Sequence, residues 1–160
     1  MILFLDTISP FPKFVLFHNN NIIQSIHILD KSNMKISDNI VLKYLIFERE
    51  NNFQDKLRKL FVLTGPGSYT ALRLGISFMY GLSISKKIPF FGIPYTSLFS
   101  NLIKENDFSK TLLFVCSSND QNFVCIPIKK KKYLIRKITK EFLCKNIDFN
   151  KYTKCIANNK

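Results

Sequence analysis

Several residue types are scarce in this chain of 160 residues, and each scarcity argues against a class of site. The sequence has no Trp, two His and four Cys. Zinc sites need closely spaced Cys or His ligands. Neither histidine lies near the cysteines, and no CxxC pair occurs among Cys116, Cys125, Cys144 and Cys155. Reduced thiols in a cytosolic protein are therefore the expected state of these cysteines.

Acidic residues are also few, with 11 against 24 basic residues and a formal net charge of +13. Such a balance favours an acidic partner, and nucleic acid is the first candidate. However, only four of the basic residues are Arg, whereas dedicated nucleic-acid contacts commonly use Arg. An AT-biased genome also encodes abundant Lys, Asn, Ile and Phe whatever the function, and we favour this second interpretation.

Long apolar runs are missing as well. The longest, Leu74 to Ile84, is followed by Lys86 and Lys87 and is too short to cross a bilayer. The first residues, "MILFLDTIS", lack a basic segment and soon reach Asp6, so they do not read as a signal peptide. We expect a cytoplasmic globular protein that makes no membrane contact.

The first part of the chain predicts three strands and then alternating helices and strands. Apolar runs at Ile2–Leu5, Phe14–Phe17 and Ile22–Ile28 are separated by turn signals, which is typical of a β-meander. Ser37 or Asp38 is then expected to cap a helix from Asn39 to about Glu50. The elements that follow are a strand at Lys59–Thr64, a helix at Tyr69–Ser85, a strand at Ile88–Ile93 and a helix from Thr96 or Ser97 to about Lys104.

This βββ-α-β-α-β-α order predicts an α/β fold with a mixed five-stranded sheet, ending near residue 106. A polar linker, "KENDFSK", follows. Three more apolar runs, "TLLFVC", "NFVCIPI" and "KYLIRKI", have no helix between them. We interpret residues 1–106 as one lobe and residues 107–160 as a second, incomplete lobe of the same type.

The stretch "LTGPGSYTALRLG" at residues 63–75 resembles a phosphate-binding loop only superficially. The Lys of a Walker loop, the third Gly of a dinucleotide-binding fingerprint and its downstream acid are all missing. A weaker alternative is an anion at the start of the helix. Simple helix capping after a tight turn competes with it, and both interpretations involve Gly65, Gly67, Ser68, Thr70 and Arg73.

The helix after this turn is apolar on all sides, with Arg73 as its only charge before Lys86. Such a helix is expected to be buried all round. Small residues at Ala71 and Gly75 would let another backbone approach closely. We therefore predict a face that packs on a partner protein, formed by Ala71, Leu72, Gly75, Ile76, Met79 and Leu82; a central helix between two lobes is the alternative.

Three segments together resemble the TsaB (YeaZ) family, which belongs to the group that makes threonylcarbamoyladenosine on tRNA. They are "FLDTISP" (residues 4–10), "TGPGSYTALRLGISFMYGLS" (64–83) and "KIPFFGIPYTSL" (87–98). The resemblance covers roughly residues 1–105. It implies an actin-like, ribonuclease H-like (ASKHA) fold of two related lobes, the second one shortened here.

The resemblance also implies a function. Family members are regarded as non-catalytic scaffold subunits that pair with the TsaD-type catalytic subunit through helices of the first lobe. The pair recruits a TsaE-type ATPase and acts on an adenosine beside the tRNA anticodon. ATP and metal are then expected on the partner subunits and no cofactor on this chain, which would self-associate when alone. The absence of an HxxxH motif, with only His18 and His27 present, agrees with a non-catalytic role.

Three features depart from the family pattern. Tyr69 and Ala71 replace Phe and Gly, and the acidic and basic pair of the second lobe is absent from "CSSNDQNFVCI". The Lys129–Lys140 run could face tRNA, although lysines at a sheet edge also prevent aggregation. Two rival functions remain: a nucleotide-binding or hydrolytic enzyme using the Gly-Pro-Gly turn, and a basic tRNA-binding module.

Overall fold

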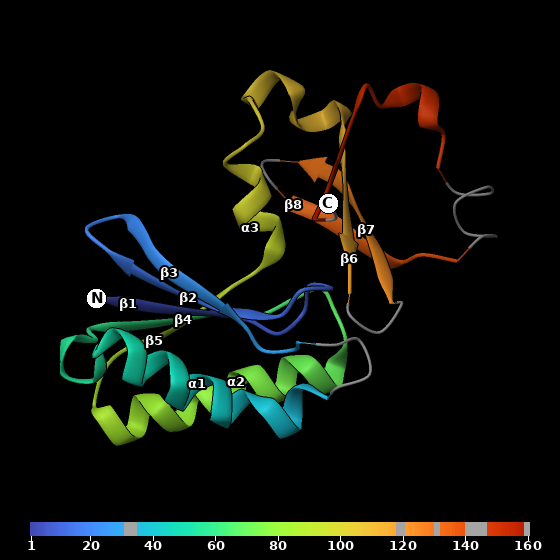
Figure 1. Ribbon diagram of the computed structural model, residues 1–160. Helices are drawn as coiled ribbons and strands as arrows, with labels where there is room; N and C mark the ends of the chain where they lie inside the picture. Colours follow the sequence, from blue (N-terminus) through green and yellow to red (C-terminus); the bar gives the residue numbers. More distant parts are fainter. Residues whose placement is uncertain (31–34, 118–120, 130–131, 140–146, 159–160) are drawn as a thin grey trace.

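The computed structural model describes residues 1–30, 35–117, 121–129, 132–139 and 147–158 (Figure 1). The chain forms two β-sheets. The first sheet, with its helices, occupies the lower part of the view in Figure 1, and the second sheet occupies the upper right. Both sheets mix parallel and antiparallel neighbours, as the sequence predicts.

The first sheet has five strands in the order β3-β2-β1-β4-β5. Its strands are β1 (Ile2–Asp6), β2 (Lys13–His18), β3 (Asn21–His27), β4 (Lys59–Leu63) and β5 (Phe90–Ile93). Strands β1, β2 and β3 form an antiparallel meander, while β4 and β5 add parallel strands beside β1. The predicted meander and the two crossover strands are therefore confirmed.

Two long helices, α1 (Ile36–Asn51) and α2 (Tyr69–Lys86), lie on one side of this sheet (Figure 1). The predicted cap of α1 is wrong, because Lys35 occupies the N-cap position and both proposed residues lie in the first turn. The third helix is also shorter than predicted. It spans Tyr95–Ser100 as α3, and the predicted linker after it forms the 3₁₀-helix η2 (Glu105–Lys110). A further 3₁₀ turn, η1, spans Gln54–Lys56.

The second sheet repeats the opening topology of the first. Its order is β8-β7-β6-β9, with β6 antiparallel to β7 and parallel to β9. The strands are β6 (Thr111–Cys116), β7 (Asn122–Lys129), β8 (Lys132–Lys137) and β9 (Lys154–Ala157), and the 3₁₀ turn η3 (Phe149–Lys151) precedes β9. The sequence predicts the first three strands. It does not predict β9, which occupies the position that β4 has in the first sheet.

Apolar packing joins the helices to the first sheet and the two sheets to each other. Between helices and sheet, Phe14, Tyr44 and Phe78 pack with ring centroids 5.5–6.0 Å apart. A second buried cluster combines Ile8, Leu63, Tyr95, Phe99, Leu113, Val115 and Cys125, so it draws on both sheets. The two sheets therefore share one buried apolar cluster.

Candidate functional site

The Gly-Pro-Gly turn sits where the first sheet meets the start of α2. Gly65 has φ +108°, a conformation that residues with a Cβ rarely adopt. A Cβ at Gly67 would overlap the side chain of the buried Ile8. Both glycines are thus required by backbone conformation and by close packing, which explains the turn without a bound phosphate.

The small residues of α2 face their own sheet. The Thr7 hydroxyl, after β1, donates to the Ala71 carbonyl at 2.8 Å, and a Cβ on Gly75 would lie 2.6 Å from the same hydroxyl oxygen. Met79 is fully buried in the core under this face. The prediction that Ala71, Gly75 and Met79 contact a partner is therefore wrong, because this chain already covers them.

The other three predicted interface residues are partly buried and pack inward as well. Leu72 contacts the cluster shared by the two sheets. Ile76 and Leu82 pack against the core between the helices and the first sheet. The sequence showed that α2 is apolar all round, but it did not show which sector the sheet covers.

The apolar surface that this helix layer leaves exposed comes mostly from α1. Exposed apolar side chains stand at successive turns of α1, and the second half of α2 adds two more. We call this set the helical face: Val41, Leu42, Leu45, Ile46, Tyr80 and Ile84. Leu45 is 54% exposed and Ile84 is 62% exposed. Exposed apolar surface gathered in one place marks an interaction site on many proteins.

The helical face has little of the positive charge that dominates the chain. The whole chain has a net charge of +13. Helix α1, by contrast, carries three acidic side chains (Asp38, Glu48 and Glu50) and two basic ones (Lys43 and Arg49). The Lys43 ammonium forms an ion pair with Asp30 at 2.7 Å. This pair ties α1 to the segment after β3 and leaves the helix slightly acidic.

The five residues of the predicted anion or capping site face different surroundings. Ser68 is buried, and its N–H donates to the hydroxyl of Ser117, the residue after β6, at 3.2 Å. Its own side chain does not cap α2. Thr70 and Arg73 are exposed, and the Arg73 guanidinium lies 5.4 Å from the centre of the Tyr69 ring. An anion at this helix start would have to compete with the bond between the two serines.

Asp6, at the end of β1, is held by internal hydrogen bonds. One carboxylate oxygen accepts the N–H groups of Ile8 and Ser9 at 2.8 and 3.0 Å, and the other accepts the Tyr95 hydroxyl at 3.1 Å. The Asp6 residue is only 5% exposed. Burial, together with the charge of Asp6, raises the pKa of Tyr95, so the phenol stays a donor. These contacts give Asp6 a structural role, as the sequence favours.

The same carboxylate borders a cavity of about 300 Å³ at the junction of the two sheets. The cavity is lined by Asp6, Ser9, Phe11, Lys13, His27, Tyr95 and Asn158. The Asn158 amide bonds the Cys116 backbone through both of its polar atoms, at 2.6 and 2.9 Å. Much of the polar lining is therefore already used, because Asp6 joins α3 to the first sheet and Asn158 joins the end of β9 to β6.

Histidines, cysteines and acids do not gather into a metal site in the described ranges, where no group of three of them could hold an ion. Cys116, Cys125 and Cys155 are free thiols, and Cys144 lies outside the described residues. Burial raises the pKa of the Cys125 thiol to about 12, which keeps it protonated and unreactive at neutral pH.

The lysine-rich run forms part of an edge strand. Lys132, Arg136 and Lys137 are exposed on β8, at one edge of the second sheet. Lys130, Lys131 and Lys140 lie outside the described residues. Exposed cations on an edge strand oppose pairing with other chains, and contact with tRNA stays a prediction.

No protein-family model and no curated protein matches the sequence, but solved structures match the fold. YeaZ from Pseudomonas aeruginosa matches with a TM-score of 0.64 and 11% identity, over 99% of this chain and 84% of that chain. A P. aeruginosa protein described as uncharacterized, with similarity to peptidase YeaZ, matches with a TM-score of 0.59 and 14% identity. That match covers 84% of this chain and 62% of the other, so this chain spans less than two thirds of its length.

At these identities the likeness concerns the fold. Two mixed sheets of matching strand order give this chain the α/β architecture of the actin-like (ASKHA) lobes, in the form found in YeaZ. None of the described helices is long and apolar enough to span a membrane. The chain thus has a YeaZ-like fold, an apolar helical face, and at the end of β1 a buried Asp6 whose carboxylate is hydrogen-bonded within the chain.

Proposed function

We propose that this chain is a non-catalytic scaffold subunit of a complex that forms threonylcarbamoyladenosine on tRNA. In this proposal it holds the TsaD-type catalytic subunit through the helical face. The catalytic subunit and a TsaE-type ATPase would supply metal and ATP chemistry, and tRNA would be reached through the assembled complex. Without its partner, the chain would self-associate.

The observation that carries this proposal is the helical face itself. Its six apolar side chains are exposed to solvent on a YeaZ-like fold. Leaving such a surface in water is unfavourable by roughly 25 cal/mol for each Å² of apolar area. Burial of this surface by a partner stabilises the complex by the same amount. Because the helical face carries little net charge, another protein can approach it in spite of the basic charge of the whole chain.

The arrangement around Asp6 supports the non-catalytic part of the proposal. In ASKHA proteins that bind nucleotides, an acid near this place faces metal or phosphate. Here three donors within the chain already occupy the carboxylate. A metal or nucleotide would have to displace bonds that hold the turn after β1 and the start of α3 together.

The proposal is tested by co-purification with the TsaD-type subunit. Replacing Leu45 or Ile84 by Arg places a charge in the helical face without disturbing the core, because both side chains are more than half exposed. Each change is expected to weaken binding at least about 30-fold, the effect of losing roughly 2 kcal/mol at an interface centre. Ile128→Arg is the matched control, since Ile128 is 63% exposed on β7 in the other sheet.

Unchanged co-purification by both Leu45→Arg and Ile84→Arg would exclude the helical face as the binding surface. Calorimetry with ATP on the isolated chain addresses the rival enzyme function. Submicromolar ATP binding would favour a nucleotide-binding protein over a scaffold, whereas the scaffold proposal expects no such binding.

A further inference from the structure

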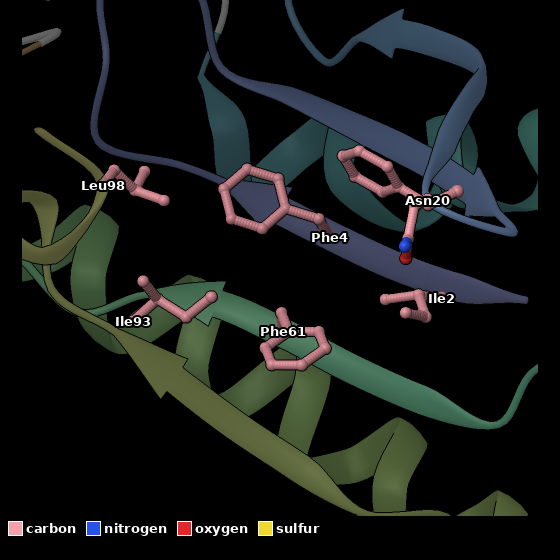
Figure 2. A pocket seen from close by; sticks show the side chains of 7 residues that line it. Ile2, Phe4, Asn20, Phe61, Ile93 and Leu98 are labelled. Carbon is pink, nitrogen blue, oxygen red and sulfur yellow. The ribbon is translucent and has the colours of Figure 1, made fainter. Parts of the chain in front are cut away.

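The two long helices α1 and α2 cover one side of the first sheet, and its other side holds an open apolar groove bounded at one end by α3. The groove has a volume of about 490 Å³ and is lined by Ile2, Phe4, Phe17, Asn20, Phe61, Ile93 and Leu98. Figure 2 shows Phe4 on β1 and Phe61 on β4 side by side on the groove floor, with Leu98 of α3 at one end. Sheet regions with parallel strands are ordinarily covered on both faces. We therefore expect another segment or molecule to bind this surface.

The groove is concave, so a helix fits it better than a flat partner surface would. Amphipathic helices commonly bind in this way, with apolar side chains at successive turns entering a hydrophobic groove. Helix α1 offers such a stripe, because Val41, Leu42, Leu45 and Ile46 are exposed at i, i+1, i+4 and i+5. The stripe and the groove lie on opposite sides of the same sheet (Figure 1), so they can meet only between two molecules.

Charge also favours this pairing. A chain with a net charge of +13 repels copies of itself over most of its surface, whereas α1 has three acidic and two basic side chains. The exposed Lys59 stands two residues before Phe61 on β4, and therefore on the groove side of the strand. A slightly acidic helix thus faces a groove with a basic end.

We propose that α1 of one copy of the chain docks into the sheet groove of a second copy. The two surfaces in contact are different, so each molecule keeps one free groove and one free helix. Such a head-to-tail contact extends into open chains and does not close as a symmetric dimer. The catalytic subunit of the proposed function would compete for α1, so chain growth belongs to the partner-free protein.

The test is sedimentation velocity of the full chain and two charge variants over a range of concentrations. Leu45→Arg blocks the helix stripe, and Leu98→Arg blocks the groove at a side chain that is 39% exposed. Ile128→Arg adds the same charge outside both surfaces. We expect the wild type and Ile128→Arg to grow beyond dimers as concentration rises, and each blocked variant alone to stay monomeric.

The mixture of the two blocked variants is the decisive sample. Leu45→Arg keeps its groove and Leu98→Arg keeps its helix, so the mixture should form one-to-one dimers and stop there. A symmetric contact between two α1 helices predicts that Leu98→Arg still dimerises alone, and this result would overturn the proposal. So would a monomeric wild type, or a mixture that stays monomeric.

A second groove variant and a binding assay keep the outcomes separable. Phe61→Ser, in the middle of the groove floor, should behave as Leu98→Arg does; if both grow like the wild type while circular dichroism shows them folded, the groove is not used. Both groove variants should still bind the catalytic subunit. If the wild type grows beyond dimers but does not bind the catalytic subunit, the result counts against the proposed function and not against this contact.

Discussion

Replacing Asp6 by Ala gives the sharpest test of the role assigned to the acid after β1. The change leaves the N–H groups of Ile8 and Ser9 and the hydroxyl of Tyr95 without their acceptor. A buried donor that loses its partner costs about 1–3 kcal/mol, so the three together predict a loss of roughly 3–9 kcal/mol in the free energy of unfolding. That is a large part of the 5–15 kcal/mol typical of a folded domain.

Two milder variants show which hydrogen bonds account for the predicted loss in the free energy of unfolding. Asp6→Asn keeps a carbonyl oxygen for the two N–H groups and should cost about 1–2 kcal/mol, because only charge-assisted strength is lost. Tyr95→Phe removes one donor, leaves the carboxylate with two, and should cost about 1 kcal/mol. Urea unfolding followed by circular dichroism measures all three free energies.

A free energy of unfolding for Asp6→Ala within about 1 kcal/mol of the wild-type value would contradict the structural role of Asp6. A carboxylate kept for a metal or nucleotide is a buried charge whose removal often leaves stability unchanged or higher. Unchanged stability would therefore return the rival enzyme function to consideration. A loss of at least about 3 kcal/mol in Asp6→Ala, with only about 1–2 kcal/mol in Asp6→Asn, would support the structural role.

Three further predictions concern stability. Gly81→Ala should stabilise the protein by about 0.5–1 kcal/mol, since a Cβ there meets nothing within 4 Å. Gly75→Ala should destabilise the protein by about 1–3 kcal/mol, because its Cβ would clash with Thr7. Thermal unfolding measures both changes. Burial raises the pKa of Cys125 from 9.0 to about 12; the unfolded chain therefore loses this proton first, and stability should fall as pH rises above 9, with a slope approaching 1.4 kcal/mol per pH unit that Cys125→Ala lacks. The buried Tyr44 hydroxyl has no hydrogen-bond partner among the described residues, so Tyr44→Phe should leave the free energy of unfolding equal or about 1 kcal/mol higher.

The sequence predicted the arrangement of strands better than the surfaces. Runs such as Ile2–Leu5 and Lys59–Thr64 are short, apolar and bounded by turn residues, so they identify buried strands whatever surrounds them. Strand β9 was missed because "KCIA" has only one bulky apolar residue in a polar context. It forms a strand through parallel pairing with β6, which is tertiary information.

The candidate site shows the same limit. The Gly-Pro-Gly turn and the structural role of Asp6 could be inferred, because both depend on local chemistry. The partner-facing residues could not, since a helix apolar on all sides gives no direction to its buried face. In α1, Leu45 and Ile46 look like core residues in sequence, yet they are exposed because Tyr44 and Phe47 take the sheet-facing positions.

Hydrogen–deuterium exchange of this chain with and without the TsaD-type subunit tests the central claim most directly. If the helical face binds the catalytic subunit, amides of α1 and the second half of α2 should gain protection in the complex, while those of β6 to β8 should not. Protection confined to the second sheet, or unchanged exchange in α1 on binding, would contradict the assignment of the helical face as the docking surface.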